Sequence, residues 1–244
     1  MGRACVDSLR GVADVLMAVD LEAPDIVGTN GVACDVADPG AVSSLVDQAR
    51  LAGPLRGLVH AAGISPTMGD ARRIFAVNLL GTALLLDGFT RLAAPGSAAV
   101  CIASSSAYQL APFATPEGDA LLDDPLAPGR LDELAGQYAD AGFAYAMSKR
   151  GVIRAAARAA VRWGAVGGRV NSLSPGIIET PMGRQELEQQ PYMRDMLAAT
   201  PAGRAGTAAE IANVVAFLLS DQASYVSGID VLVDGGMLQG LAQQ

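Results

Sequence analysis

Short apolar runs alternate with segments of helical length along this chain of 244 residues, and this alternation restricts its fold more than any other feature. The apolar runs, each bounded by Gly, Pro or Asp, are 13–20, 55–63, 97–105, 167–176 and 228–236. The helical segments, rich in Ala and Leu, are 38–52, 70–94, 145–164 and 207–220. Buried strands that alternate with helices form βαβ units around a parallel sheet. The sequence therefore predicts an α/β fold with a doubly wound parallel sheet, and its length fits a single domain over residues 1–244.

One region breaks the alternation of strands and helices. Residues 108–143 are acidic and rich in Pro and Gly. They are far longer than an ordinary connection of about 2 to 6 residues. We expect an inserted lid or interface element here, with two short helices.

Charge and cysteine content exclude several classes of function. The formal net charge is -8, which argues against nucleic acid or an anionic membrane surface as a partner, because such partners need clustered Lys and Arg. Cys5, Cys34 and Cys101 are far apart and predict neither a disulfide framework nor a zinc pair. The apolar runs are short for a membrane span, and the first residues lack the apolar core of a signal peptide. We expect a cytoplasmic protein.

A single histidine and a single lysine stand out in the composition. His60 leaves no basis for a His-rich metal site, so no metal is predicted, and we expect it to be a packed or hydrogen-bonded core residue. Lys149 is the only lysine among 17 basic residues. Arg and Lys are not interchangeable where a compact ammonium must sit among several hydrogen-bond acceptors. The position of Lys149 therefore requires an explanation.

Tyr145 and Lys149 are four residues apart, so on a helix they share one face. Val152, Ala156 and Trp163 continue this face and predict that it is buried. A phenol has a pKa of about 10, and a fixed ammonium nearby favours the phenolate. The pair is a candidate acid and base, although Tyr and Lys at this spacing also occur by chance in many helices.

Five sequence motifs occur in a fixed order along the chain, and one of them contains Tyr145 and Lys149. They are "HAAG" at 60–63, "AVNLLG" at 76–81, "CIASS" at 101–105, "YAMSK" at 145–149 and "NSLSPGIIETPM" at 171–182. With these motifs the chain resembles the short-chain dehydrogenase/reductase family over essentially its whole length. The resemblance implies a Rossmann-like fold and an oxidoreductase that uses a nicotinamide cofactor.

The resemblance implies four catalytic residues. Tyr145 would give or take the proton at the substrate oxygen. Lys149 would hydrogen-bond the nicotinamide ribose and lower the pKa of Tyr145. Ser104, preferred over its two serine neighbours, would donate a hydrogen bond to the carbonyl oxygen, and Asn78 would lie in the proton path behind Lys149, through a water.

The resemblance also implies a cofactor site. Asp20, at the end of an apolar run, would accept hydrogen bonds from a ribose 2'-hydroxyl and repel a 2'-phosphate, which favours NAD over NADP. Ala62 takes the place of the usual asparagine, and the Gly63 turn remains. The other residues expected to contact or shape the site are Gly2, Asp35, Val36, Ala61, Tyr145, Lys149, Pro175, Gly176, Ile178 and Thr180.

The start of the chain differs from the family pattern. Such a fold begins with a strand and a glycine-rich loop that carries the pyrophosphate. Here Gly2 resembles the last glycine of that loop, and the first strand is missing, so we expect the natural protein to extend upstream by about a dozen or more residues. The missing strand belongs between the strands that end at Asp20 and near His60.

The insert indicates the class of substrate, but only broadly. It separates Ser104 from Tyr145, as in the 3α-hydroxysteroid dehydrogenase/carbonyl reductase branch of the family. This implies a largely apolar ketone or secondary alcohol such as a steroid, a terpenoid or an aromatic alcohol, with Leu110, Phe113, Leu121 and Leu122 available to line the pocket. The insert would also obstruct one pairing face, so a homodimer is favoured over a tetramer. The alternative is a catalytically weak or inactive relative that acts as a binding or regulatory module.

Overall fold

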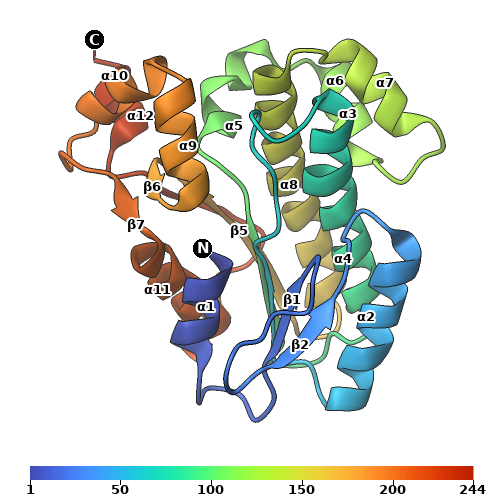
Figure 1. Ribbon diagram of the computed structural model, residues 1–244. Helices are drawn as coiled ribbons and strands as arrows, with labels where there is room; N and C mark the ends of the chain where they lie inside the picture. The colour runs from blue at the N-terminus through green and yellow to red at the C-terminus, as the bar shows by residue number, and fades with distance from the viewer. Residues whose placement is uncertain (244) are drawn as a thin grey trace.

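A four-stranded parallel sheet forms the centre of the protein in the computed structural model, which describes residues 1–243 (Figure 1). Its strand order is β3-β4-β5-β8, from β3 (Gly57–His60), β4 (Ala98–Ile102), β5 (Arg169–Pro175) and β8 (Asp230–Val233). Every residue of β4 is buried, because helices cover both faces of the sheet. All four strands lie within the predicted apolar runs, and the α/β parallel-sheet prediction is confirmed.

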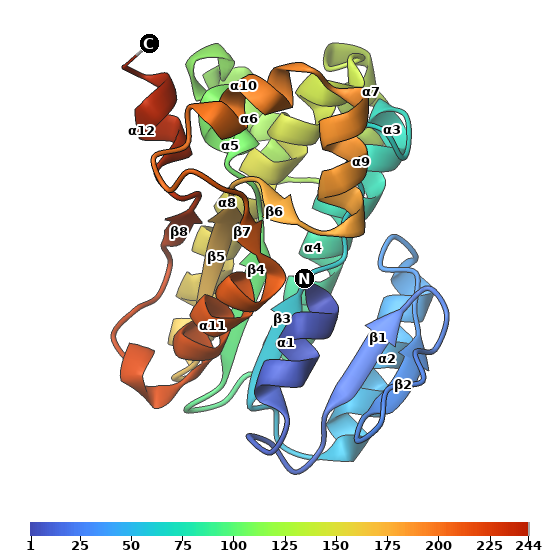
Figure 2. The same cartoon turned by 60° about the vertical axis from the view of Figure 1, so that its left-hand side comes forward.

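A second, two-stranded sheet stands apart from the first. It pairs β1 (Met17–Asp20) in parallel with β2 (Asn30–Ala33). The sequence did not predict β2, because "NGVA" is short and its first two residues favour turns. Within residues 1–243 no strand joins β1 to β3, and this is where we expected a strand to be missing. Figure 2 shows α1 (Gly2–Leu9) beside β3, with the β1–β2 pair set apart.

Two apolar cores lie on the two faces of the sheet. On one face, the first core includes Phe89, Trp163 and Val170 and is covered by α2 (Pro39–Ala52), α4 (Gly81–Thr90) and α8 (Ala141–Gly164). On the other face, Cys5 of α1 packs with Leu173 and with Ile211 of α11 (Ala208–Leu219). This arrangement makes the sheet doubly wound.

A π-helix interrupts the helical stretch Ala71–Thr90. α3 (Ala71–Ile74) leads into η1 (Phe75–Leu80), in which the Gly81 N–H bonds to the carbonyl of Ala76 five residues earlier, and α4 follows. By length and hydropathy this stretch is the one candidate membrane span in residues 1–243, but 61% of its apolar window is buried inside the protein. It packs against α8, as a core helix does.

The insert folds onto the outer side of α8. It contains α5 (Ser106–Gln109), the short 3₁₀ turn η2 (Ala111–Phe113), α6 (Pro116–Asp123) and α7 (Arg130–Gln137). Leu122 is completely buried in a core shared with Phe75 and Met147. Our expectation that Leu122 lines a pocket is wrong, because α6 turns this side chain inward against α8.

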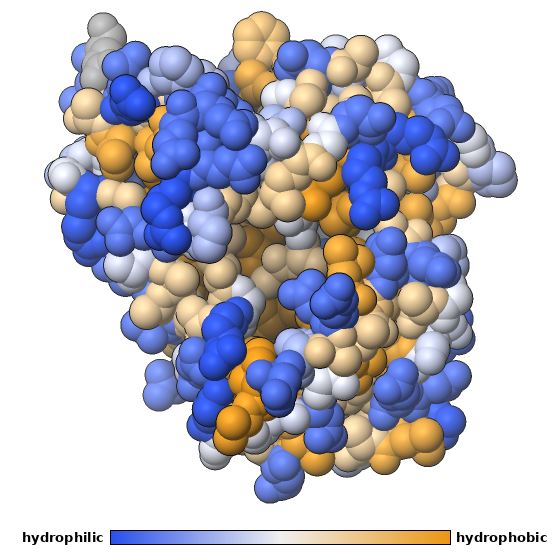
Figure 3. Space-filling view, viewed as in Figure 1, coloured by the Kyte–Doolittle hydropathy of each residue, from blue (hydrophilic) through white to orange (hydrophobic). Residues whose placement is uncertain are grey.

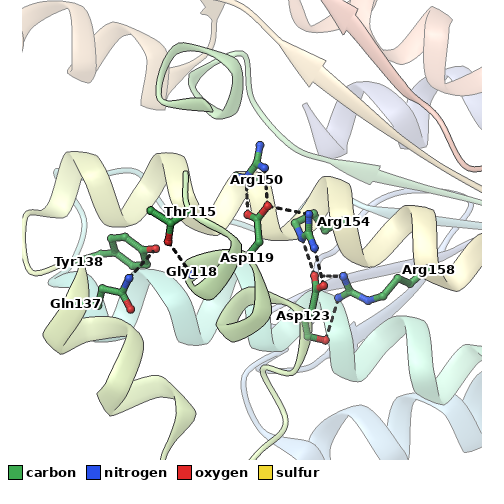
Figure 4. A network of polar contacts seen from close by, with 9 residues as sticks. All are labelled: Thr115, Gly118, Asp119, Asp123, Gln137, Tyr138, Arg150, Arg154 and Arg158. Carbon is green, nitrogen blue, oxygen red and sulfur yellow. Dashed lines mark hydrogen bonds and ion pairs between the residues drawn. The ribbon is translucent and has the colours of Figure 1, made fainter. Parts of the chain in front are cut away.

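Three arginines of α8 bind two aspartates of α6 (Figure 4). Arg150 donates two hydrogen bonds to Asp119, both at 2.7 Å. Arg154 bridges Asp119 and Asp123, and Arg158 also binds Asp123. Bidentate arginine–carboxylate geometry is stronger and more specific than an ordinary surface ion pair. The network fixes the insert to the helix that carries Tyr145 and Lys149.

The last third of the chain covers the carboxyl ends of the central strands. The elements are β6 (Ile178–Glu179), α9 (Pro181–Gln189), α10 (Tyr192–Ala198), β7 (Gly206–Thr207) and α12 (Met237–Leu241). The short turn η3 (Asp221–Ala223), which follows α11, lies at the opposite end, where Arg169 of β5 donates to the carbonyl of Ser220. α9 and α10 were not predicted, because α9 is largely polar and α10 is only 7 residues long. Figure 3 shows the face hollowed between α9 and the part of the molecule that holds α1 and β1.

Candidate active site

Tyr145 and Lys149 lie in the first turns of α8, which Asp140 caps by accepting a hydrogen bond from the Phe143 N–H at 2.8 Å. Lys149 is 5% exposed, and its Nζ donates to the carbonyl of Ile102, the last residue of β4, at 3.0 Å. The Nζ lies 5.8 Å from the centre of the Tyr145 ring. The structure thus places the predicted pair together at the carboxyl end of β4.

Ser104 is the serine that faces Tyr145. Its hydroxyl lies beside the Tyr145 phenol and acts to lower the pKa of that phenol. Ser106 donates to Ser104 Oγ from its N–H at 3.2 Å and from its hydroxyl at 3.0 Å. Ser105 is buried. Of the three serines, Ser104 is the one that acts on the Tyr145 phenol, and its catalytic role stays a prediction.

Asn78 lies in the π-helix η1 and connects three elements. Its Oδ1 accepts from the Ile64 N–H at 2.9 Å, and its Nδ2 donates to the Ile64 carbonyl at 3.0 Å. Nδ2 also donates to Ser148 Oγ on α8 at 3.1 Å. The Asn78 side chain therefore fixes the loop after β3 relative to α8 and η1. π-bulges of this kind are frequent at functional sites.

Gly63 shows how closely these groups approach one another. A Cβ atom at this position would lie 3.1 Å from Asn78 Oδ1 and 3.1 Å from Lys149 Nζ. Both distances are tighter than ordinary contacts, so only glycine leaves the backbone free to run past the two polar groups. The "HAAG" turn thus joins Asn78 and Lys149 in one site.

Burial controls the protonation of the pair. It raises the pKa of Tyr145 to about 12, with Glu186 adding to the rise and the Ser104 hydrogen bond opposing it. Burial also lowers the pKa of Lys149 to about 8. The pKa of the Tyr145 phenol is therefore raised overall, because the desolvation of the phenolate is the largest effect on it, and the role expected for Lys149 in lowering this pKa stays a prediction.

Glu186 is a site residue that sequence reasoning missed. It lies on α9, where burial raises the pKa of its carboxyl group and Lys149 lowers it. Its charge acts in turn on Tyr145, Lys149 and Tyr192. The segment "QELEQQ" gave no signal, since polar runs of this kind are usually solvated surface.

The residues expected at the adenosine end lie along the carboxyl ends of β1 and β2. Asp20 is exposed, and its Oδ1 accepts from the Leu21 N–H at 2.8 Å. Asp35 Oδ1 accepts from the Ala37 N–H at 2.9 Å. Val36 is buried in the core against Gly81, so its side chain faces away from any ligand at this edge.

Gly2 and the "HAAG" turn lie next to each other. A Cβ atom at Gly2 would lie 3.7 Å from the Cβ of Ala61, so the amino end of α1 faces the end of β3. A helix amino terminus with a small residue at this place suits the approach of an anion. Ala61 is partly buried and Ala62 is exposed.

The loop after β5 is close to β8. A Cβ atom at Gly176 would lie 2.8 Å from Asp234 Cα, so this position has no room for a side chain, and Pro175 before it ends β5. Ile178 is buried in the core beneath α11, and its carbonyl accepts from the Thr180 N–H at 2.8 Å. Thr180 Oγ1 accepts from the Gly183 N–H at 3.0 Å as the cap of α9, and its hydroxyl hydrogen remains available to donate.

Comparison with known proteins places this geometry in context. Residues 15–118 and 133–238 match a family described as Enoyl-(Acyl carrier protein) reductase, and the unmatched residues between them fall inside the insert. A short-chain dehydrogenase/reductase of Alternaria brassicicola is 33% identical over 86% of this chain and 78% of its own length. A 3-alpha-hydroxysteroid dehydrogenase/carbonyl reductase of Comamonas testosteroni is 35% identical over 74% of this chain and 72% of its own length.

A solved structure extends the likeness to the whole chain. The 3-alpha-hydroxysteroid dehydrogenase of Pseudomonas sp. B-0831, crystallised as a complex with NADH, aligns with a TM-score of 0.82 and 31% identity. The alignment covers 100% of this chain and 94% of that one. The similarity therefore includes all three sheets (β1-β2, β3-β4-β5-β8 and β6-β7), the insert and the segment that carries α9 and α10.

Proposed function

The chain belongs to the short-chain dehydrogenase/reductase family, and from this premise we propose that it is an NAD-dependent oxidoreductase acting on a largely apolar ketone or secondary alcohol. The observation that carries the proposal is that Lys149 lies beside Tyr145 and Ser104 on one side and, with Asn78, against Gly63 on the other. A non-catalytic relative has no chemical need for this set. The hydroxysteroid dehydrogenases similar to this chain support a steroid-like substrate.

The residues present fit a nicotinamide cofactor. Gly63 lets the backbone pass close to Lys149, and the exposed Asp20 carboxylate stands at the end of β1. When bound, NAD supplies the carbon that accepts or returns the hydride. Lys149 would hold the ribose hydroxyls of the cofactor, and the backbone of Ile178 with the hydroxyl of Thr180 would hold its carboxamide.

Ser104 and Tyr145 handle the substrate oxygen. Ser104 donates a hydrogen bond to this oxygen and holds it beside the phenol, which stabilises the charge that develops there. In ketone reduction Tyr145 gives its proton to the oxygen, and in alcohol oxidation it takes that proton. With a pKa of about 12, Tyr145 carries its proton at neutral pH and is ready to act as the donor.

A screen of ketones and secondary alcohols, followed by the absorbance of NADH, tests the proposal. We expect turnover with apolar cyclic substrates. Tight binding of NAD with no turnover across the panel would instead favour the second candidate, a family member that serves as a binding or regulatory module.

Asp20 gives a prediction about the choice of cofactor. Asp20→Ala removes the carboxylate that repels a 2'-phosphate, so the preference for NAD over NADP in kcat/KM should fall about tenfold or more, which corresponds to ~1.4 kcal/mol. Asp14→Ala is a matched control, because it removes the same charge from an exposed loop before β1. An unchanged ratio of kcat/KM with NAD to kcat/KM with NADP in Asp20→Ala would show that Asp20 has a role only in the turn.

The insert gives a prediction about assembly. α6 occupies the outer face of the Arg150–Arg158 part of α8 through its two aspartates, so this face is closed to a second subunit. We propose a homodimer formed through another surface. Light scattering on the purified protein should give the mass of two chains, and a mass of four chains would contradict the prediction.

A further inference from the structure

A buried chain of hydrogen bonds runs beneath the candidate active site. His60 Nε2 lies 3.0 Å from Thr82 Oγ1, and Thr82 Oγ1 donates to the backbone carbonyl of Asn78 at 2.6 Å. His60, Thr82 and Asn78 are 4%, 0% and 1% exposed. The chain joins the end of β3 to the start of α4 through the π-helix.

The direction of each hydrogen bond follows from its last acceptor. The Asn78 carbonyl has no proton, so the Thr82 hydroxyl must donate to it. The same hydroxyl oxygen can then only accept from His60, which requires the tautomer with hydrogen on Nε2. Burial, together with the charge of Lys149, lowers the pKa of His60 to about 3, so the ring stays neutral and this order of donors persists over the working pH range.

The chain ends at the residue that organises the site. Asn78 is held in the wide turn of η1, and its side chain binds Ile64 and Ser148. Next to Ile64 in the sequence, Gly63 passes closely between Asn78 Oδ1 and Lys149 Nζ. A shift of the Asn78 backbone therefore moves the groups that surround the lysine.

We propose that His60 and Thr82 are positioning residues that hold the Asn78 turn, and through it the Gly63 loop and Lys149, in the geometry needed for turnover. The inference rests on the proposed function. His60 and Thr82 hydrogen-bond to each other and to the Asn78 carbonyl, not to the Tyr145 phenol. Both act through Asn78.

The same helix contains a matched arrangement far from the site. Thr90 Oγ1 donates to the carbonyl of Leu86 at 2.6 Å and accepts from Trp163 Nε1 at 3.0 Å. The chemistry is the same as at Thr82: a ring N–H, a threonine hydroxyl and a carbonyl four residues earlier. Thr90 lies at the opposite end of α4 and does not contact Asn78.

Thr82→Val and Thr90→Val form the test pair. Each replaces a threonine by a residue of the same shape, and each leaves a ring N–H without its acceptor. Both variants should melt at a lower temperature than the natural sequence. Only Thr82→Val should lower kcat, by roughly tenfold, while KM for NAD changes by less than about twofold. Thr82→Ser, which keeps the hydroxyl, should restore most of the lost kcat.

His60→Phe extends the test to the other end of the chain and should lower kcat in the same direction as Thr82→Val. If Thr82→Val and Thr90→Val have equal kcat, the chain has only a structural role and the inference is overturned. The inference is also overturned if serine fails to rescue kcat in a folded variant.

Hydrogen exchange separates this inference from the proposed function, because it needs no turnover. In Thr82→Val, peptides covering 62–66 and 75–83 should exchange faster than in Thr90→Val, even if the natural protein turns over no substrate in the screen. Equal exchange of these peptides in the two variants would overturn the positioning role by itself.

Discussion

Tyr145→Phe should reduce turnover by about 10²- to 10⁴-fold, the range that a positioned acid or base contributes. The change removes only the hydroxyl and keeps the ring, which packs against the core that holds Phe75, Leu122 and Met147. The fold and the affinity for NAD should therefore stay nearly unchanged. Initial rates with the best substrate of the screen, together with a binding titration of NADH, measure both quantities.

The control for this variant is Tyr225→Phe. Tyr225 is fully exposed in the loop before β8, so this substitution removes the same hydroxyl group far from the site. Its turnover should equal that of the natural sequence. Comparable turnover in Tyr145→Phe would show that another group handles the proton, and it would remove Tyr145 from the proposed mechanism.

Lys149→Arg should lower kcat/KM by about a hundredfold or more, as when a positioned donor is removed from an active site. The Lys149 ammonium is buried, lies 3.0 Å from the Ile102 carbonyl and closely approaches the Gly63 backbone. A guanidinium is wider and places its donors in a planar fork, so it cannot occupy the same volume with the same hydrogen bonds.

Arg162→Lys is the matched control on the same helix, since Arg162 is exposed near the end of α8. It should leave kcat/KM unchanged. A Lys149→Arg variant with nearly full activity would show that the site does not require a lysine at this position. Steady-state kinetics with NAD and substrate varied in turn measure the effect.

The alternation of strands and helices could be predicted from the sequence because buried parallel strands are short and apolar. The strands β3, β4, β5 and β8 lie where apolar runs were found. β2 could not be predicted, because "NGVA" gains its stability from pairing with β1 and not from its own propensity. α9 was missed because it is largely polar, and α10 because it has only 7 residues, three of which pack against the core around Met237.

The motifs allowed the residues of the candidate site to be predicted one by one. The pKa values of Tyr145 and Lys149 could not be predicted in the same way. Spacing placed Tyr145 one turn from Lys149, and the structure agrees. The pKa of a buried phenol depends on how much water the fold removes and on charges from distant segments, such as Glu186. Neither quantity can be read from a spacing of four residues.

The roles of His60 and Thr82 illustrate the same limit. His60 was expected to be a hydrogen-bonded core residue, and its bond to Thr82 confirms this. Its partner lies 22 residues away, on another element, and only the fold brings the two together. The connection of both residues to Asn78 became visible only with the π-helix.

Transfer of an isotope tests the central claim most directly. NADH carrying deuterium at the transferable position of its nicotinamide ring would be incubated with the protein and the ketone that the screen selects. The proposed function predicts that mass spectrometry finds the deuterium on the carbinol carbon of the alcohol product, in the natural sequence and not in Tyr145→Phe under the same conditions. An alcohol product without the label, or no product from any ketone of the panel while NADH binds, would contradict it.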